Sequence, residues 1–101
     1  MTEKTIQLRQ YDVDPAGLPA FIAWWRDQLV PVRIAAGFTI ESAYADHAAG
    51  RFTWAVSKPL GSADFEAALQ EWEDSPARAE VLAGRPTPIL SSSYAIVVDA
   101  L

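Results

Sequence analysis

The chain lacks cysteine altogether, and its 101 residues include a single histidine. Without cysteine there can be no disulfide, no thiolate metal site and no cysteine nucleophile. Long apolar runs are absent as well: no stretch approaches the ~20 residues of a transmembrane helix, and the first five residues lack the apolar core of a signal peptide. We therefore expect a cytoplasmic protein without a membrane span.

Positive charge is also scarce. The chain carries eight Lys and Arg against 13 Asp and Glu, a net charge of -5, and the basic residues are scattered along it. A nucleic acid or an anionic membrane would select a basic face, so we expect neither as a partner. The sequence has no glycine-rich phosphate loop and no nucleophile elbow, and it predicts no bound cofactor.

The sequence does contain segments in which apolar residues recur every second position, followed by segments in which they recur with the period of a helix. A period of two over residues 5–13 gives way to a helical period, which predicts a strand followed by a helix that ends near residue 36, before Gly37. Pro31 lies inside this helix and removes one of its hydrogen bonds, so we expect a kink near Asp27 to Gln28. Further strands are expected at residues 38–46, 51–58 and 92–99, with a helix from residue 62 and a short helical turn over 76–82.

The order strand, helix, strand, strand, helix, strand is typical of an α+β fold, the ferredoxin-like βαββαβ sandwich. A four-stranded antiparallel sheet then carries both helices on one face. Right-handed crossovers select the strand order 4-1-3-2. The turn at residues 47–50 is short enough to require an antiparallel hairpin between its two strands.

Alternation along the strands assigns their residues to two faces. The face expected under the helices carries Ile6, Leu8, Phe38, Ile40, Ser42, Tyr44, Phe52, Trp54, Val56, Tyr94, Ile96 and Val98. The opposite face carries Gln7, Arg9, Tyr11, Thr39, Glu41, Ala43, Ala45, Thr53, Ala55, Ser57, Ala95 and Val97. Because this second face is small and mixed rather than strongly charged, it predicts a homodimer whose sheets pack face to face. The alternative is a solvent-exposed face that tolerates small residues.

Several short motifs resemble those of NIPSNAP domains. They are Gln7-Leu8-Arg9-Gln10-Tyr11, Pro15-Ala16-Gly17, Phe21 to Trp25, the in-helix Pro31, Trp54 before the second helix, and Asp74-Ser75-Pro76 leading into Ala77 to Leu82. The resemblance covers nearly the whole chain and implies a single domain over residues 1–101, of the dimeric α/β barrel superfamily. Ala77 and Arg78 stand where the family tends to have an aromatic residue, and the resemblance implies no catalytic residue.

Aromatic residues are the best candidates for a ligand site. The predicted ligand-binding residues are Trp25, Tyr44, Trp54 and Tyr94, with Ser42 and Gln10 as polar neighbours. An aromatic cleft with a few polar groups suits a small, largely apolar metabolite. The alternative is an ordinary packed core, since aromatic residues at this spacing usually pack. Trp24 is rotated by about 100° from Trp25 and is expected to face solvent or a partner.

His47 is a weak candidate for a catalytic acid or base. It is the only histidine and titrates near neutral pH, but it falls in the turn between two strands, where an exposed polar residue is ordinary. One histidine beside Asp46 is not a metal-ligand set, so no metal is expected. The acidic residues at 71, 73 and 74 do not share one helical face and are expected to be solvated.

Two arginines have a polar partner within reach of the predicted elements. Arg9 and Arg26 could meet a carboxylate or a carbonyl of a ligand. Because Arg9 is placed on the dimer face, we expect it instead to form a cross-interface or inter-strand ion pair, with Glu41 or Asp99. Arg26 and Asp27 are expected to form a solvated helix edge.

Three functions remain open at this point. The first is a binding module, a dimer that holds a small, largely apolar metabolite between sheet and helices. The second is a cofactor-free oxygenase or isomerase acting on a phenolic or enolic substrate, in which Trp and Tyr side chains and His47 hydrogen-bond or deprotonate the substrate. The third is a structural or interaction dimer.

Overall fold

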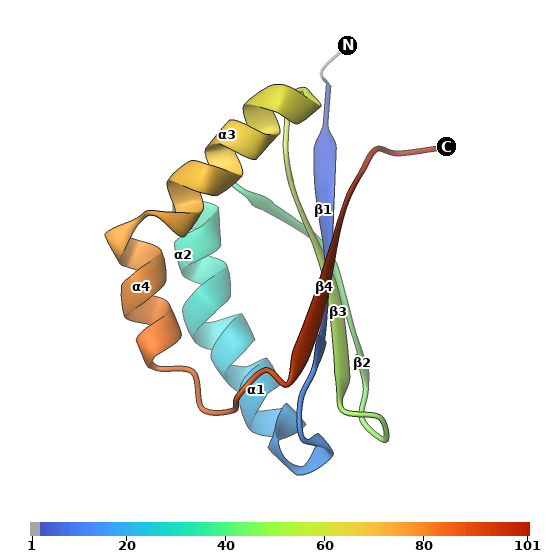
Figure 1. Cartoon of the computed structure of the whole chain (residues 1–101), viewed down its shortest axis with the longest axis vertical. Coiled ribbons are helices and arrows are strands. Elements are labelled where there is room, and N and C mark those ends of the chain that lie inside the picture. Colours follow the sequence, from blue (N-terminus) through green and yellow to red (C-terminus); the bar gives the residue numbers. More distant parts are fainter. Residues whose placement is uncertain (1–2) are drawn as a thin grey trace.

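The computed structural model describes residues 3–101 and shows a single four-stranded antiparallel sheet with helices on one side (Figure 1). Its elements are β1 (Thr5–Asp12), a 3-10 turn (Pro15–Gly17), α1 (Leu18–Trp24), a π-helical turn (Trp25–Leu29), α2 (Val30–Ala35), β2 (Thr39–Asp46), β3 (Arg51–Lys58), α3 (Ser62–Glu73), α4 (Pro76–Ala83) and β4 (Ser91–Val97). The strand order β2-β3-β1-β4 is the predicted order read from the other edge. The ferredoxin-like α+β prediction is confirmed, and the expected short turn after residue 75 is an eight-residue helix.

The first helical segment departs from regular α-helix geometry at the place where a kink was predicted. The π-helical turn Trp25–Leu29 joins α1 to α2 directly before Pro31, whose missing N–H removes one hydrogen bond from this continuous helical segment. An i, i+4 series on a regular helix drifts around the axis, because a turn holds 3.6 residues. The extra residue of the π turn offsets that drift. Leu29 and Arg33 therefore stay on the buried side of the segment together with Trp25.

The inward face of β1 is opposite to the one predicted. Gln7, Arg9 and Tyr11 pair with Val56, Trp54 and Phe52 of β3, so they share the helix side of the sheet with those core residues. Tyr11 is only 5% exposed, whereas Leu8, predicted under the helices, is 41% exposed on the other side. The prediction was wrong because it ranked residues by hydropathy alone, while pairing with β3 decides which face of β1 is covered.

A β-bulge in β2 changes the face of its second half. Ile40 pairs with Val56 and Ser42 with Ala55, so Glu41 has no partner of its own in the ladder. The extra residue reverses the alternation. Ser42 and Tyr44 consequently lie on the side away from the helices, where Tyr44 is 71% exposed, and not under the helices as predicted. Residues 43 and 45 take the helix side instead.

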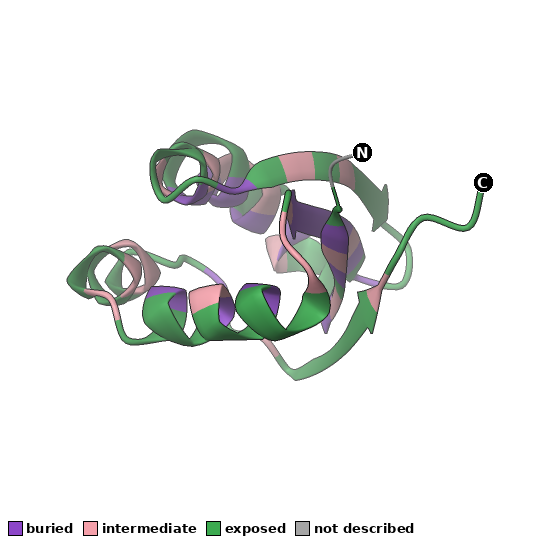
Figure 2. Cartoon of the chain, turned by 90° about the horizontal axis from the view of Figure 1, so that it is seen from above, coloured by how far each residue is buried: buried purple, intermediate pink, exposed green. Residues whose placement is uncertain are grey.

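Aromatic rings join the helices to the sheet. The ring of Trp25 meets those of Trp54 and Phe52 edge-on, at centroid distances of 5.5 and 4.9 Å, and such contacts stabilise a core beyond the area they bury. Trp24 is buried as well, since its Nε1 donates a hydrogen bond to the carbonyl oxygen of Val81 in α4, 3.3 Å away. The expectation that Trp24 faces solvent or a partner is therefore wrong. Figure 2 shows the buried residues on the inner sides of the helices and in the middle of the sheet.

The face of the sheet away from the helices is not covered by any helix or strand formed by residues 3–101 (Figure 1).

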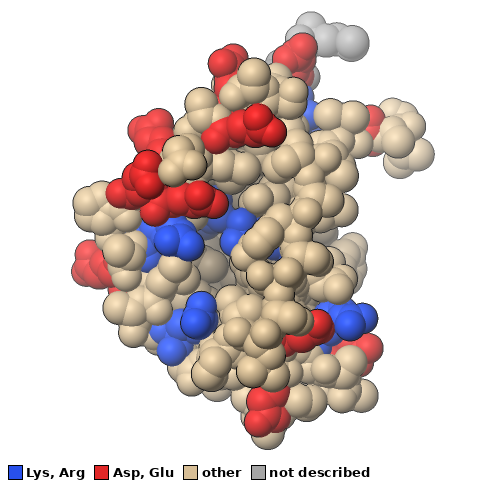
Figure 3. All heavy atoms as spheres, viewed as in Figure 1, with Lys and Arg blue, Asp and Glu red and all other residues tan. Residues whose placement is uncertain are grey.

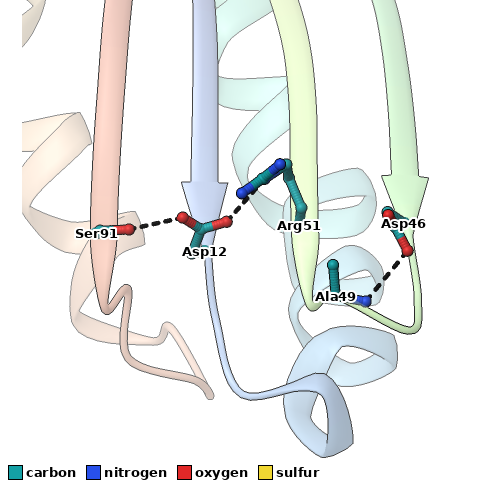
Figure 4. Close-up of polar contacts among 5 residues, drawn as sticks. All are labelled: Asp12, Asp46, Ala49, Arg51 and Ser91. Atoms are coloured by element: carbon teal, nitrogen blue, oxygen red, sulfur yellow. Dashed lines mark hydrogen bonds and ion pairs between the residues drawn. The ribbon is translucent and has the colours of Figure 1, made fainter.

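Near one end of this sheet the carboxylate of Asp12 accepts hydrogen bonds from Ser91 Oγ at 2.8 Å and from Arg51 Nε at 3.0 Å, which links β1 to both of its neighbours (Figure 4). These bonds, from Ser91 first and Arg51 second, lower the pKa of Asp12.

Candidate functional site

A buried arginine forms the centre of the site. Arg33 lies four residues after Leu29 on the inner side of α2 and is only 2% exposed. Its guanidinium carbon lies 4.4 Å from the ring centre of Trp72, 4.7 Å from that of Phe38 and 5.5 Å from that of Trp54. The cation is thus surrounded by aromatic rings from α3, from the segment before β2, and from β3.

The guanidinium of Arg33 forms no ion pair with a carboxylate of residues 3–101. Nothing within residues 3–101 accepts a hydrogen bond from its Nε or Nη1. Burial lowers the pKa of Arg33 to about 9; the charges of Arg9 and Arg78 lower it too, while Tyr11 and Glu73 oppose them. The side chain is therefore still cationic at neutral pH, and it holds an uncompensated charge away from water, which folding otherwise avoids.

Arg9 approaches the same region from β1. Its guanidinium carbon lies 4.4 Å from the ring centre of Tyr94 and 5.7 Å from that of Trp54. Its Nε donates to the hydroxyl oxygen of Tyr11 and its Nη1 to Oε1 of Gln7, both at 2.7 Å. Arg9 thus has neutral hydrogen-bond partners only, among the residues that the structure describes.

The ion pair predicted for Arg9 is wrong. Glu41 lies on the other side of the sheet, where it accepts hydrogen bonds from Lys4 at 2.7 Å and from Ser57 Oγ at 3.1 Å. The Lys4 bond is the main cause of the lowered pKa of Glu41. Arg9 faces the helices because β1 is turned relative to the prediction, so it cannot reach that carboxylate.

The two arginines line a small cavity between sheet and helices. Its volume is about 100 Å³, and its lining residues are Arg9, Tyr11, Leu29, Arg33, Trp54, Trp72, Arg78, Leu82, Arg85, Ile89 and Tyr94. Four of the eight Lys and Arg of the chain are in this lining, and no acidic residue is. Figure 3 shows basic side chains gathered around a hollow between α4 and β4. An acidic protein therefore has one concentrated patch of positive charge, at a concave site.

The lining of this pocket keeps further hydrogen-bond donors without a partner. The indole Nε1 of Trp54, a lining residue, is buried and donates to nothing in the described part of the chain, and the same holds for Nε1 of Trp25 directly behind it. Most buried polar groups in folded proteins have a partner. Arg33, Trp54 and Trp25 thus all keep hydrogen-bond donors that are unpaired within residues 3–101 at or next to this pocket, and a ligand with acceptor atoms could pair with those that reach the pocket.

The predicted ligand-binding residues are only partly brought together. Trp54 and Tyr94 line the pocket, and Trp25 contacts Trp54 without lining it. Tyr44 and Ser42 lie on the opposite side of the sheet because of the bulge, and Gln10 lies there because it pairs with Thr53 and Ser93.

The sequence analysis missed three of the four arginines. A signal existed for Arg33, because it follows Trp25 and Leu29 at intervals of four and so continues the buried stripe of the helix. A charged residue at a core position of a stripe is unusual enough to mark a site. Arg78, in α4, and Arg85, in the irregular segment that follows it, had no comparable signal in the sequence.

The remaining candidates of the sequence analysis are exposed. His47 occupies the turn between β2 and β3, as its alternative interpretation predicted, and Asp46 Oδ1 there accepts a hydrogen bond from the backbone N–H of Ala49 (Figure 4). Arg26 and Asp27 form an exposed ion pair at 3.0 Å, as expected. Residues 3–101 contain no group of side chains that could hold a metal ion, and none of their helices is long and apolar enough to cross a membrane.

A larger groove lies elsewhere, between the first helical segment and α4. Its volume is about 490 Å³, and it is lined by Trp24, Gln28, Val32, Ala77, Glu80, Val81 and Gly84. No orphaned buried donor from residues 3–101 lies in its lining. The smaller pocket around Arg33 is therefore the better candidate for a ligand site, because its lining contains buried donors without an acceptor in residues 3–101.

Comparison with known proteins identifies the fold. No protein-family model matches the chain, and no curated protein matches it in sequence. Among solved structures, an uncharacterised NIPSNAP domain protein from Burkholderia xenovorans superposes with a TM-score of 0.78 at 11% identity, covering 95% of this chain and 94% of that one. A NIPSNAP family protein of unknown function from Agrobacterium tumefaciens gives 0.80 at 11% identity, over 98% and 90%.

Other neighbours carry a different description. A putative antibiotic biosynthesis monooxygenase from Caulobacter crescentus superposes with a TM-score of 0.71 at 14% identity, covering 99% of this chain and 92% of that one. At these identities the likeness shows the fold alone. The resemblance to NIPSNAP domains is confirmed at that level.

Proposed function

We propose that this protein binds a small organic molecule in the pocket between its sheet and its helices. The observation that carries the proposal is the set of buried donors without acceptors at one cavity, on Arg33 and Trp54. A buried donor left unsatisfied costs about 1–3 kcal/mol. A ligand with acceptor atoms would recover that cost, and the rings of Trp54 and Trp72 would pack against its apolar body.

The pocket sets a limit on what fits. Its volume of about 100 Å³ lies well below the ~300–1,000 Å³ of sites for drug-sized ligands. A compact molecule, or one end of a longer molecule that leaves the pocket past the half-exposed Tyr94, fits this space. From the sequence we expected a largely apolar metabolite. The arginines in the lining favour a more polar one, because they can donate hydrogen bonds to it.

Two tyrosines provide a matched test of this site. Tyr94 is 54% exposed on β4 and lines the pocket, whereas Tyr44 is exposed on β2, at the other edge and on the other side of the sheet. Ligand-observed NMR with a library of small aromatic compounds should identify binders whose signals are lost with Tyr94→Ala and retained with Tyr44→Ala. Equal binding by both variants, or loss with Tyr44→Ala alone, would move the site away from this pocket.

A second candidate is a cofactor-free oxygenase or isomerase acting on a phenolic or enolic substrate. Two observations favour it: buried positive charge that would stabilise a phenolate or enolate, and the putative antibiotic biosynthesis monooxygenases among the structural neighbours. Aerobic incubation with phenolic and enolic compounds, followed by mass spectrometry, tests this candidate. Product formation that Arg33→Met abolishes would support an enzyme. Binding of these compounds without product formation would favour the binding protein over the enzyme.

We also propose that the chain forms a homodimer through the sheet face away from the helices. The β1 and β2 corrections place Leu8 and Tyr44 on this face, where both are exposed, beside the small residues of β4. An uncovered face with exposed apolar side chains is typical of an association surface. A dimer that serves only as a scaffold is the third candidate, and the cytoplasmic location stays a prediction.

A further inference from the structure

We infer that the ligand of this pocket is an organic anion whose carboxylate, or an equivalent oxyanion, binds the guanidinium of Arg33. This inference deepens the proposed function and rests on it. It names the chemical class of the ligand and the residue that anchors it.

The first argument is the geometry of Arg33. Its guanidinium is a planar fork of donors that matches a carboxylate in a two-point contact. Its surroundings in the fold are the rings of Phe38, Trp54 and Trp72, which pack against a cation but offer no in-plane acceptor. The N–H groups of Nε and Nη1 remain unused by residues 3–101, and Arg33 lies in the wall of the cavity.

The second argument is charge. A neutral ligand could accept a hydrogen bond from Arg33, but it would leave the buried positive charge uncompensated. An anion does both, and charge-assisted hydrogen bonds are about twice as strong as neutral ones. Among the described residues, Glu73 supplies the one carboxylate that acts on the pKa of Arg33, and Glu73 is exposed and has the smallest influence of the groups that do so.

The third argument is the convergence of further arginines. Arg9 reaches the pocket from β1, Arg78 from α4 and Arg85 from the segment that follows it. Like charges repel and gather at a concave site at a cost, unless an anion occupies the space between them. In a chain with a net charge of -5, such a pocket draws acids that the rest of the surface repels.

The fourth argument distinguishes an organic anion from an inorganic one. Trp54, Trp72 and Tyr94 share the lining with the arginines. A phosphate or sulfate ion would use the arginines and leave these rings without a contact. An aromatic acid uses both, with its carboxylate at Arg33 and its ring against the indoles.

The experiment compares three probes: benzoate, its neutral isostere benzamide, and inorganic phosphate. Each is titrated into the wild-type chain and followed by NMR of the indole N–H signals. We expect benzoate to bind at least tenfold more tightly than benzamide, and phosphate to compete with benzoate only weakly. Arg33→Met should bring the benzoate and benzamide affinities to within about twofold of each other, whereas Arg26→Met, which removes an exposed arginine of the same helical segment, should leave the preference intact.

The outcomes separate this inference from the proposed function. If benzamide bound as tightly as benzoate, and Tyr94→Ala abolished that binding, the ligand would not need to be an anion. The pocket would still be the binding site. Phosphate displacing benzoate at equal concentration would make the ligand an inorganic anion and overturn the organic class. Failure of every probe to shift the indole signals at millimolar concentration would count against both the pocket and the anion. Should Arg33→Met fail to fold, Arg85→Met serves in its place, because Arg85 is exposed, and it should reduce benzoate affinity severalfold with that of benzamide unchanged.

Discussion

The guanidinium carbon of Arg33 lies 4.4 Å from the centre of the Trp72 ring, and this contact joins α2 to α3 beside the pocket. A desolvated cation–π contact contributes about 2 kcal/mol. Removing an ion from water costs several kcal/mol even after the protein relaxes around it. The contacts with the aromatic cage of Phe38, Trp54 and Trp72 offset part of this cost, and we expect the uncompensated charge to destabilise the ligand-free state.

The first prediction concerns stability without ligand. Arg33→Met keeps a long side chain in the cage and removes the charge, so we expect the free energy of unfolding to rise by about 1–3 kcal/mol. Urea unfolding of both proteins in ligand-free buffer measures the difference. A lower stability of Arg33→Met would mean that the cation–π contacts outweigh desolvation, and that Arg33 serves the fold rather than a ligand.

The second prediction concerns pH. Arg33 has a folded-state pKa of about 9, below its ordinary value, because it is buried and lies near Arg9 and Arg78, with Tyr11 and Glu73 opposing. Benzoate affinity should be constant near neutral pH and fall as the pH rises through about 9, since Arg33 then loses its charge. Binding to Arg33→Met should not show this fall. An affinity that stays constant to pH 10 would contradict the role of Arg33.

The same pKa shift predicts how the difference in unfolding free energy between Arg33→Met and the wild-type chain changes with pH. Above about pH 9, and below the higher ordinary pKa of an arginine, the unfolded chain keeps a proton on Arg33 that the folded chain has released. The unfolding free energy contributed by this group therefore rises with pH in that window. The stability difference between the two proteins should narrow above pH 9.

Most of the fold could be predicted from the sequence because its signals are local. The position of Pro31 marked the irregular turn, and Gly37, with a φ of 91°, takes the left-handed conformation that ends the helix. The strand order followed from the handedness of crossovers, which depends on chain geometry and not on particular side chains.

The site was harder to predict because it depends on which face each strand presents. One bulged residue, Glu41, moved Tyr44 to the other side of the sheet. Thr5 was no apolar signal, yet it is buried, because its Oγ1 donates to the carbonyl oxygen of Leu60 at 2.7 Å. Neither the bulge nor this hydrogen bond has a mark in the hydrophobic pattern, and the bulge decides on which side of the sheet Ser42 and Tyr44 lie.

The third prediction concerns acid stability. The pKa of Asp12 is lowered by its bonds from Ser91 and Arg51, so its contribution to stability is complete above the ordinary Asp pKa of ~3.9 and is lost as the pH falls through the folded value. Asp12→Asn should lower the melting temperature at pH 7 by a few degrees, and the difference should shrink toward pH 3. A difference that is constant with pH would contradict an electrostatic origin. The exposed Glu66→Gln, beyond the first turn of α3, serves as the control and should change neither value.

The fourth prediction concerns association. If the uncovered sheet face joins two copies, a charge on it should separate them, because two carboxylates would then approach across the two-fold axis. Tyr44→Glu should sediment as a monomer at micromolar concentration, whereas Ala45→Glu, also exposed but on the helix side, should sediment with the wild-type chain. Monomeric wild-type protein, or dissociation by Ala45→Glu alone, would contradict the proposed interface.

The fifth prediction concerns the segment that closes the pocket. Residues 76–90 bring Arg78 and Arg85 to the lining, and the one side-chain hydrogen bond between α4 and the first helical segment in the described structure runs from Trp24 to Val81. An anion held by Arg33 on α2 and by these two arginines would connect α4 to the core. Saturating benzoate should therefore slow amide hydrogen exchange in residues 76–90 severalfold, with residues 62–70 of α3 as the internal control. Arg85→Met should reduce this protection while benzoate still binds, since Arg33 remains the anchor. Unchanged exchange in residues 76–90 at full occupancy would show that the ligand contacts the sheet and α2 alone, and that α4 covers the pocket without holding its contents.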